Sequence, residues 1–539
     1  MCGSAEEGAE RQLGQHHAYR GCAAYKWRSD GLAFTVGRPR GVPGAAPLMV
    51  GSWLNQVPSM RPQTLVALAL LPITGCVLSS HSSAGDAPET GATGGIDGGA
   101  TSSGGDVVSV SISPHRPIVV VGGSVNLEAT VSNATNRAVT WSIVEGASGG
   151  AITASGVYTA PANAGTYHVT ATSQADANKS DTIDVDVHTI SPCPAAGATP
   201  LGAWQNVTPP GTDMQKHNGQ TVYGTQGVLV NPQETSIVYV GVDRQGLFRS
   251  SDCGATWAHI NTGRNGDVVG TGAQWSMVMD PGHPDTIYAI NGYGSTMGLW
   301  KTIDGGVDWD QLLPQGSAVV NVAGAFASIV SMDPTDAQHL VVSFHGPCSG
   351  TYAPTCLAET TNGGADWNIV KTDYRKKTGE AVTNYEGAGV MVIDKTTWVV
   401  GFPSDGLYAT TNGGATWSNV TPNGVNGTGW QMYHSPITHL HYIGSSPGSV
   451  SSPDGVTWTL LSNAGAGTSM VGTGQTLVTS VQYGGAFYSG NEALGNGWAP
   501  LAHPDNPLQR GAYFLAYDSD HQFLFATEQE GGLWRVGIQ

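Results

Sequence analysis

Aromatic, basic and acidic side chains gather in the polar stretches between the apolar runs of residues 195–539. Aromatic rings stack on the C–H faces of sugars, while Arg, Lys, His and carboxylates bind sugar hydroxyls or pair with an acidic sugar. Solvated loop residues of the same types, binding nothing, are the simpler alternative. The candidate ligand-binding side chains are Lys216, His217, Asp243, Arg244, Arg264, Trp275, Tyr293, His345, Tyr374, Arg375, Lys376, Lys377, Glu380, Tyr385, Glu386, Trp430, His434, Arg510 and Tyr513.

Two kinds of bond cleavage are compatible with these residue types. Elimination beside a uronate needs a cation that neutralises the carboxylate and a His, Tyr or Lys that acts as the base. Glycoside hydrolysis needs two carboxylic groups instead, and the sequence does not identify both members of such a pair. The candidate pool for elimination is His217, Arg244, His345, Tyr374, Arg375 and His434.

The composition indicates an all-β protein with many tight turns. Of 539 residues, 40% are hydrophobic and 76 are glycine, whereas only 12% are charged, and long helical patterns are missing. A chain of this length can bury the cores of two or more domains. The formal charge of −18 makes nucleic acid and anionic membrane surfaces poor general partners.

A repeated sequence motif, called the repeated word below, separates the loops that carry the candidate residues. It reads GLFRSSDCGATW up to Trp257, and variants end at Trp309, Trp367, Trp417 and Trp458, with a decayed copy at Trp498. The spacing of about 40 to 58 residues is that of a propeller blade rather than of a helical repeat. A final half-copy, GGLWRV, ends the chain, and WQNVTP from Trp204 supplies its missing partner. Seven blades that close in this way leave no exposed sheet edge.

The repeated word has a structural purpose of its own. An Asp or Asn side chain accepts backbone N–H bonds within a turn, Gly permits a positive φ there, and Trp wedges between neighbouring sheets. We therefore interpret these acids and amides as residues that hold turns rather than as catalytic acids. They are Asp252, Asp304, Asn362, Asn412 and Asp454.

These words resemble the Asp-box, or bacterial neuraminidase repeat, over about residues 200 to 539. The resemblance implies a single seven-bladed β-propeller at 195–539. In that family the Asp-box turns lie on the face opposite the usual site. Function is then expected in the loops after each second strand and between blades, and the fold alone does not fix an activity.

Within this resemblance, enzyme families match to different degrees. IVYVGVDRQGLFRSSD is similar to the xyloglucanase pattern in which an Asp after the second strand is the general base, which implies that role for Asp243. That family carries its acid on a second propeller, and this chain has only one. Sialidases carry an early Arg-Ile-Pro word and usually six blades, and the word is missing here. Glycoside hydrolase and polysaccharide lyase activity therefore both remain as alternatives. We expect no cofactor for either activity. In the pool of catalytic candidates Asp243 joins the six residues above.

A non-catalytic module that binds glycan or protein at the surface remains the alternative to an enzyme. The predicted substrate-binding residues are Lys216, Arg264, Trp275, Tyr293, Tyr385, Trp430, Arg510 and Tyr513. The expected partner is a polysaccharide or glycan, and the expected state is a monomer.

Residues 107–188 have the short alternating runs of an antiparallel sandwich. The stretches AVTWSIVEG, GVYTAPANAGTYHVTATS and SDTIDVDV resemble the bacterial immunoglobulin-like family. The resemblance implies a spacer or adhesion module, with Trp141 in its core and no active site.

The segment before this domain resembles an export signal. Residues 60–76 read MRPQTLVALALLPITGC, similar to a bacterial lipoprotein signal whose cysteine, here Cys76, becomes lipidated. A buried strand or short helix ending in Gly-Cys is the alternative. The signal predicts that 1–59 is a non-native or disordered extension and that the Gly/Ser-rich residues 77–106 are a flexible tether. It also predicts a lipoprotein of the bacterial outer membrane or cell surface.

In an exported chain, the remaining four cysteines predict two disulfides, Cys348–Cys356 and Cys193–Cys253. Zinc is the rival interpretation, but no CxxC or HExxH spacing supports it, so we expect no metal.

We expect Cys76→Ser to abolish the incorporation of labelled fatty acid when the full chain is produced in a bacterium, because the thiol is the acylated atom. Autoradiography of the purified protein checks this. A Cys22→Ser variant serves as the control and should retain the label. Labelling that persists in Cys76→Ser would contradict the lipoprotein signal.

Overall fold

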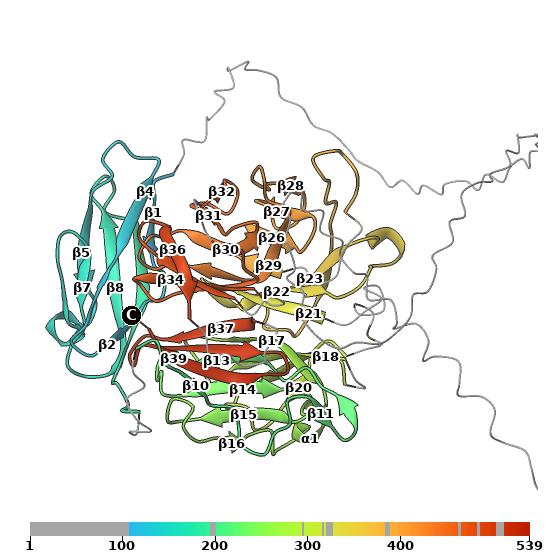
Figure 1. Ribbon diagram of the computed structural model, residues 1–539. Coiled ribbons are helices and arrows are strands. Elements are labelled where there is room, and N and C mark those ends of the chain that lie inside the picture. The colour runs from blue at the N-terminus through green and yellow to red at the C-terminus, as the bar shows by residue number, and fades with distance from the viewer. Residues whose placement is uncertain are drawn as a thin grey trace, which may run out of the picture. The chain divides into compact units, whose positions relative to one another are not determined.

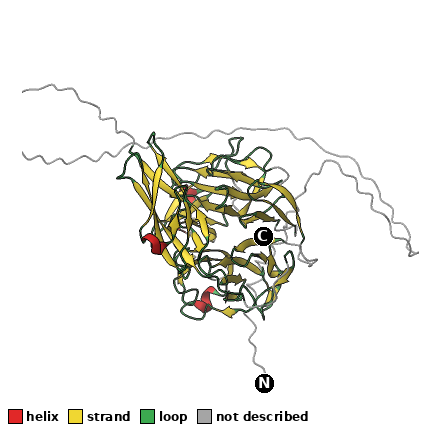
Figure 2. Cartoon of the chain, turned by 90° about the vertical axis from the view of Figure 1, so that its left-hand side faces the viewer, coloured by secondary structure: helices red, strands yellow, loops and turns green. Residues whose placement is uncertain are grey.

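The computed structural model describes residues 107–193, 201–293, 296–314, 317, 319, 327–382, 389–461, 465–481, 486–502 and 511–538. The signal at 60–76 with Cys76 and the tether at 77–106 lie outside these residues, as do Tyr385, Glu386 and Arg510. The described elements are strands apart from α1 (Gly266–Val269) and the 3-10 helices η1 (Gly146–Gly149) and η2 (Gly350–Tyr352) (Figure 2). The prediction of an all-β chain is confirmed. In the same residues, no helix is long and apolar enough to cross a membrane.

Seven antiparallel sheets of four strands each account for most of the described residues from 204 to 537. The first three sheets are β13 (Thr225–Val230), β14 (Val238–Val242), β15 (Gly246–Ser250) and β16 (Ala258–His259); β17 (Ala273–Met279), β18 (Ile287–Gly292), β19 (Gly298–Thr302) and β20 (Asp310–Gln311); and β21 (Ala327–Asp333), β22 (Asp336–Phe344), β23 (Cys356–Thr360) and β24 (Asn368–Lys371).

The next three sheets are β25 (Gly389–Val392), β26 (Trp398–Phe402), β27 (Gly406–Thr410) and β28 (Ser418–Asn419); β29 (Gly427–His434), β30 (His441–Ser446), β31 (Val450–Ser452) and β32 (Thr459–Leu460); and β33 (Ser469–Gly472), β34 (Thr476–Ser480), β35 (Phe487–Asn491) and β36 (Asn496–Leu501). The seventh comprises β37 (Ala512–Asp518), β38 (Phe523–Glu528), β39 (Gly532–Gly537) and β10 (Trp204–Asn206).

The first strands of the seven sheets, called inner strands below, form a closed ring. Each inner strand contacts the next, from β13 through β17, β21, β25, β29 and β33 to β37, and β37 contacts β13 again. Figure 1 labels β13, β17, β21, β29 and β37 of this ring. The seventh sheet joins both ends of this region, because β10 pairs with β39 through Trp204↔Val536 and Asn206↔Trp534. Closure buries both faces of every sheet against its neighbours.

The repeated word forms the same hydrogen-bonded turn between the third and fourth strands of successive sheets. In the first sheet, Ser250 Oγ donates to Asp252 Oδ1 at 2.7 Å and accepts the Gly254 N–H at 2.8 Å. Asp252 also accepts the Thr256 N–H at 2.8 Å. Burial opposes ionisation of Asp252, but the bonds from Thr256 and Ser250 leave its pKa below the ordinary value. The other members of the set bind in the same way: Thr302 with Asp304, Thr360 with Asn362, Thr410 with Asn412, and Ser452 with Asp454.

The tryptophan of each word closes its turn. Trp309 Nε1 donates to the Gly306 carbonyl at 2.8 Å, and its side chain is fully buried. Trp257 differs, because its Nε1 donates to the carbonyl of Val207, which directly follows β10. The first repeat therefore also ties down the strand that closes the ring.

Two disulfides occur within the described part of the chain. Cys348 and Cys356 close a short loop with their Cα atoms 5.9 Å apart, and Cys193 joins Cys253 in the first repeated turn.

The described residues from 109 to 188 form three smaller sheets around a core of their own. These are β2 (Ile118–Val120), β9 (Ser180–His188), β8 (Gly165–Ser173) and β5 (Val139–Ile143); β3 (Ser124–Asn126), β7 (Val157–Thr159) and β6 (Ala151–Ile152); and β1 (Ser109–Ser113) with β4 (Glu128–Ser132). Tyr158, Val169 and Val185 are fully buried in the core, and Trp141 packs against it.

We expect Asp252→Ala to lower the free energy of unfolding by about 2 kcal/mol, because the turn loses an ionised acceptor of several hydrogen bonds. A denaturant titration checks this, with the exposed Asp267→Ala as the control. Unchanged stability together with a selective loss of glycan binding would contradict the assignment of Asp252 as a residue that holds a turn.

Candidate functional site

Strand pairing defines two faces of the ring. The inner strands begin where the second strands end, as in Thr225↔Val242 and Ala273↔Gly292, and we call this end the loop face. The third strands run from the loop face to the opposite end, the turn face, where the repeated turns lie. Residues that follow a second strand or precede an inner strand therefore meet on the loop face.

Asp243 directly follows β14 on the loop face and is 1% exposed. Its Oδ2 accepts the Tyr223 N–H at 2.7 Å, and its Oδ1 lies 3.7 Å from Arg244 Nε. Burial raises the pKa of Asp243, while the Tyr223 N–H and the charges of Arg244 and His217 oppose the rise. A buried carboxyl whose pKa is raised in this way is suited to proton transfer.

Arg244 adopts φ 58°, a conformation that is unusual for a residue with a side chain and recurs at functional sites.

A short hairpin places His217 near this carboxyl. It consists of β11 (Lys216–His217) and β12 (Gln220–Thr221). Gln245 anchors the loop that precedes it, since its Oε1 accepts the Asp213 N–H at 2.8 Å and its Nε2 donates to the Asp213 carbonyl at 2.6 Å. The structure therefore brings together the predicted residues Asp243, Arg244 and His217, with the exposed Lys216 beside them.

Six rings from four sheets and a linker form an aromatic cluster on the same face. It consists of Tyr223, Trp275, Tyr293, His345, Trp430 and Tyr513. Tyr223 stacks on Tyr293 with centroids 5.6 Å apart, and Trp275 lies 5.3 Å from Tyr293. Trp275 also contacts His345 at 5.0 Å and Tyr513 at 6.2 Å, and Tyr513 stacks on Trp430 at 4.8 Å.

Bulges in the inner strands explain how these rings meet. The register shifts between Gln274 and Ser276 in β17, between Thr428 and Met432 in β29, and between Ala512 and Leu515 in β37. Trp275, Trp430 and Tyr513 lie within these three irregular stretches. Because a bulge re-aims the side chain of its extra residue, it turns these rings away from the regular alternation of the strand.

Tyr223 links the carboxyl to the aromatic cluster. Its N–H binds Asp243 while its ring stacks on Tyr293, so Asp243 lies at the edge of the cluster. Sequence reasoning missed Tyr223, whose only signal was its position in the polar linker after His217. A carboxyl beside aromatic rings can orient a sugar and exchange a proton with it or with water.

Tyr374 and Arg375, two of the predicted catalytic residues, lie apart from Asp243 and the aromatic cluster. Tyr374 is 3% exposed and packs in the core against Phe402, Tyr408 and Trp417, and burial raises its pKa well above the ordinary value. Arg375 pairs with Asp373 at 2.7 Å. The long linker between sheets carries Tyr374 into the core, and no sequence pattern distinguishes that course from an exposed loop.

Two further predicted residues lie elsewhere. The guanidinium of Arg264 pairs with Asp310 in the outer strand of the second sheet. His434 is the last residue of β29 and stands opposite His441, which places it on the turn face, far along its strand from the loop face. Tyr385 and Arg510, predicted to bind substrate, are outside the described residues.

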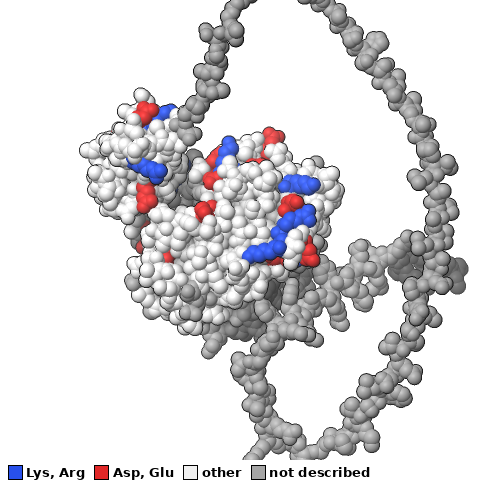
Figure 3. All heavy atoms as spheres, turned by 90° about the horizontal axis from the view of Figure 1, so that it is seen from above, with Lys and Arg blue, Asp and Glu red and all other residues white. Residues whose placement is uncertain are grey.

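The lysines of the linker after the third sheet are engaged by acidic or polar partners. Lys376 Nζ lies 2.6 Å from Asp405, and Lys377 Nζ donates to Asn423 Oδ1. Figure 3, which views one side of the molecule from above, shows Lys and Arg beside Asp and Glu there, with most of the viewed surface carrying neither.

One group of potential metal ligands occurs in the described part of the chain: Cys193, Cys253, Asp518 and His521. The two sulfurs are bonded to each other, and His521 pairs with Asp518 at 2.7 Å. The group therefore offers no thiolate to an ion.

Comparisons with known proteins found xyloglucanases among the relatives of this chain. No family model matches the chain. A xyloglucanase of Acetivibrio thermocellus is 24% identical over 248 residues, which is 39% of this chain and 26% of that protein. A probable oligoxyloglucan-reducing end-specific xyloglucanase of Neosartorya fischeri is 26% identical over 251 residues, 40% of this chain and 29% of that protein. The chain thus spans between a quarter and a third of the length of these relatives.

Among solved structures, a GH74 enzyme of Niastella koreensis aligns with a TM-score of 0.44 and 17% identity, covering 62% of this chain and 53% of that one. If this protein is an enzyme, its xyloglucanase relatives support a glycoside hydrolase.

His441 makes the stability of the fifth sheet depend on pH. Its burial, followed by the nearby His434, lowers its pKa from 6.5 to about 4, against the opposing charges of Asp454 and Asp394. The unfolded chain therefore takes up a proton more readily, and the stabilisation present above pH 6.5 is lost as the pH falls toward 4. We expect His441→Gln to show a smaller fall in melting temperature over this interval. The exposed His283→Gln is the control, and a profile for His441→Gln that matches the wild type would contradict this assignment.

Proposed function

We propose that this protein is a glycoside hydrolase acting on a polysaccharide of the xyloglucan type, with Asp243 as the general base. The observation that carries the proposal is the carboxyl of Asp243 itself, buried, held by the Tyr223 N–H and placed at the edge of the aromatic cluster. The relatives named as xyloglucanases support the substrate class.

In this mechanism the aromatic cluster binds the sugar chain and Asp243 takes a proton from the attacking water. The Tyr223 N–H binds one carboxylate oxygen, Oδ2, while the other, Oδ1, lies nearer Arg244. Hydrolysis also needs an acid that protonates the leaving oxygen. His217, whose charge acts on Asp243, is the candidate for this role in place of the usual second carboxyl.

A polysaccharide lyase is less well supported. Its candidate pool is divided, with Tyr374 in the core, Arg375 paired with Asp373 and His434 on the turn face. A non-catalytic glycan-binding module is the second candidate, because the aromatic cluster would bind a sugar chain whether or not a bond is cut.

The remaining parts of the proposal concern architecture and location. The ring at 195–539 is a seven-bladed Asp-box propeller, supported by its seven four-stranded sheets and repeated turns. The sheets within 107–188 are an immunoglobulin-like spacer. Residues 1–59 are a dispensable extension, the signal at 60–76 exports the chain, and lipidated Cys76 with the 77–106 tether holds it at the outer membrane or cell surface as a monomer.

We expect the full chain to release reducing ends from xyloglucan, and Asp243→Asn to lower kcat about a thousandfold because the base is lost. Since burial raises the pKa of Asp243, kcat/KM should fall on the acidic side at a pH above 3.8, the ordinary pKa of the group. Reducing-end assays over a pH series measure both.

Asp405→Asn is the matched control, since it removes another largely buried carboxylate that is paired with Lys376. Melting temperatures establish that both variants fold. Full activity of a folded Asp243→Asn would rule out its role as base. Unsaturated products from a uronate-containing polysaccharide would indicate a lyase, and retardation in a xyloglucan gel without cleavage would indicate the binding module.

A further inference from the structure

A cavity of about 490 Å³ lies on the axis of the ring, inside the circle of inner strands. It extends from Trp430 and Phe514 to Pro232, Pro281 and Pro334, which begin the turns into the second strands. It therefore runs from below the aromatic cluster toward the turn face, and it is distinct from the position of Asp243. Its volume falls within the range of about 300 to 1,000 Å³ that is typical of small-molecule sites.

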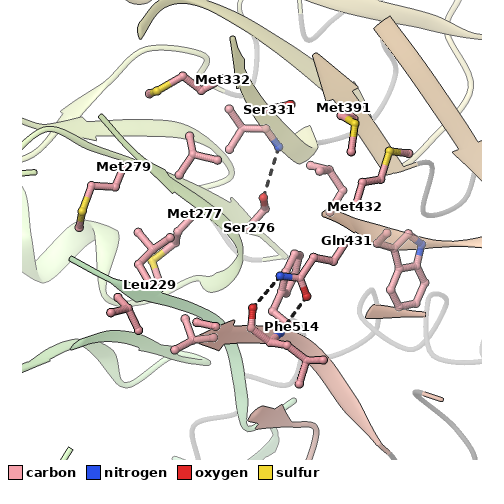
Figure 4. A pocket seen from close by; sticks show the side chains of 18 of the residues that line it. Leu229, Ser276, Met277, Met279, Ser331, Met332, Met391, Gln431, Met432 and Phe514 are labelled. Carbon is pink, nitrogen blue, oxygen red and sulfur yellow. Dashed lines mark hydrogen bonds between the residues drawn. The ribbon is translucent and has the colours of Figure 1, made fainter. Parts of the chain in front are cut away.

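Five methionines line this cavity. Met277 and Met279 come from β17, Met332 from β21, Met391 from β25 and Met432 from β29, and Figure 4 shows these side chains around the open space. The five come from four consecutive inner strands. The rest of the wall is mainly aliphatic, with Val228, Leu229 and Val330 among its members. Methionine is flexible and polarisable, so such a wall adapts its shape to a guest.

Four polar side chains in the wall, those of Ser276, Ser331, Gln431 and Asp333, are already engaged. Ser276 Oγ accepts the Val330 N–H at 3.3 Å, and Ser331 Oγ accepts the Val392 N–H at 3.0 Å. Each serine thus satisfies the free edge of the next inner strand, which would otherwise present its N–H to the cavity.

Gln431 likewise satisfies backbone groups of another inner strand, but that strand is not the next one in the ring. Its Nε2 donates to the Leu515 carbonyl at 2.6 Å, and its Oε1 accepts the Leu515 N–H at 2.8 Å. The side chain therefore pairs β29 with β37 as a strand would, as the dashed lines in Figure 4 show. At the other end Asp333 is bonded to Thr335 and His339. Apart from the indole N–H of Trp430, the side chains of the wall consequently offer a guest mainly apolar contacts and thioethers.

We propose that this axial cavity is a binding site for a small, uncharged aromatic molecule. Water gains few partners from the side chains of such a wall, and apolar cavities of smaller volume take up aromatic guests. Thioether sulfur makes favourable contacts with ring edges, and Phe514 and Trp430 supply ring surfaces at one end. The inference is independent of the proposed hydrolase activity.

Trp430 connects this site with the aromatic cluster. It lines the cavity and also stacks on Tyr513, so an occupant restricts a ring that the proposed sugar-binding surface uses. The cavity therefore has a route by which its occupant can alter glycan binding.

The test uses the full chain carrying [methyl-¹³C]methionine, titrated with indole and followed by NMR. We expect saturable shifts in the methyl signals of Met277, Met332, Met391 and Met432, assigned with single Met→Leu variants. Met470 is the matched control, because it is a buried methionine of the inner strand β33 that does not line the cavity. Its signal should stay in place.

Blocking variants make the result decisive. Met332→Trp and, independently, Met432→Trp should each weaken indole binding at least about tenfold while the melting temperature shows a folded protein. Either folded variant suffices. The proposal is overturned if the cavity methyls do not shift, if Met470 shifts as much as they do, or if a folded blocking variant binds indole as tightly as the wild type.

Discussion

Closure of the ring is the constraint on which the other features depend. The pairing of β10 with β39 completes the seventh sheet with a strand from the opposite end of the region, and Trp257 and the Cys193–Cys253 disulfide fasten the first repeated turn beside it. Until that sheet is complete, β13 and β37 lack each other as neighbours and both ends of the array remain open edges. With closure, every inner strand faces a common axis. That geometry creates the loop face and the axial cavity together.

Closure of the ring leaves one edge of each inner strand without a strand partner. Each pairs with a second strand on one side only, so its other edge would expose N–H and C=O groups to the axis. Ser276, Ser331 and Gln431 cap these groups with side chains from neighbouring or nearby strands. The same strands are bulged near the loop face, which moves Trp275 and Tyr513 into the aromatic cluster. One set of strands thus supplies an apolar interior and, near the loop face, two largely buried rings of the aromatic cluster.

The two faces of the ring carry carboxylates with different roles. Those of the turn face stabilise turns, and Asp243 on the loop face is the candidate base. On the turn face, carboxylates such as Asp252 are saturated by local hydroxyl and N–H donors, which lower the pKa. On the loop face, Asp243 receives one N–H bond and is more deeply buried, and its pKa is raised. Identical functional groups therefore hold a proton differently because one is surrounded by donors and the other is largely desolvated. This contrast, rather than the residue type, distinguishes the candidate base from the acids of the repeats.

The sequence by itself determined the all-β class, and its repeated words encoded the turns that hold Asp252 and Asp304, because those hydrogen bonds span only a few residues. It also singled out Asp243, Trp275 and Tyr513. Only the tertiary structure decided which side chains meet. It buried Tyr374, moved His434 to the turn face, and brought in Tyr223, which the sequence left unmarked. Such contacts depend on strand register, bulges and closure between segments far apart in the chain, and no local pattern records them.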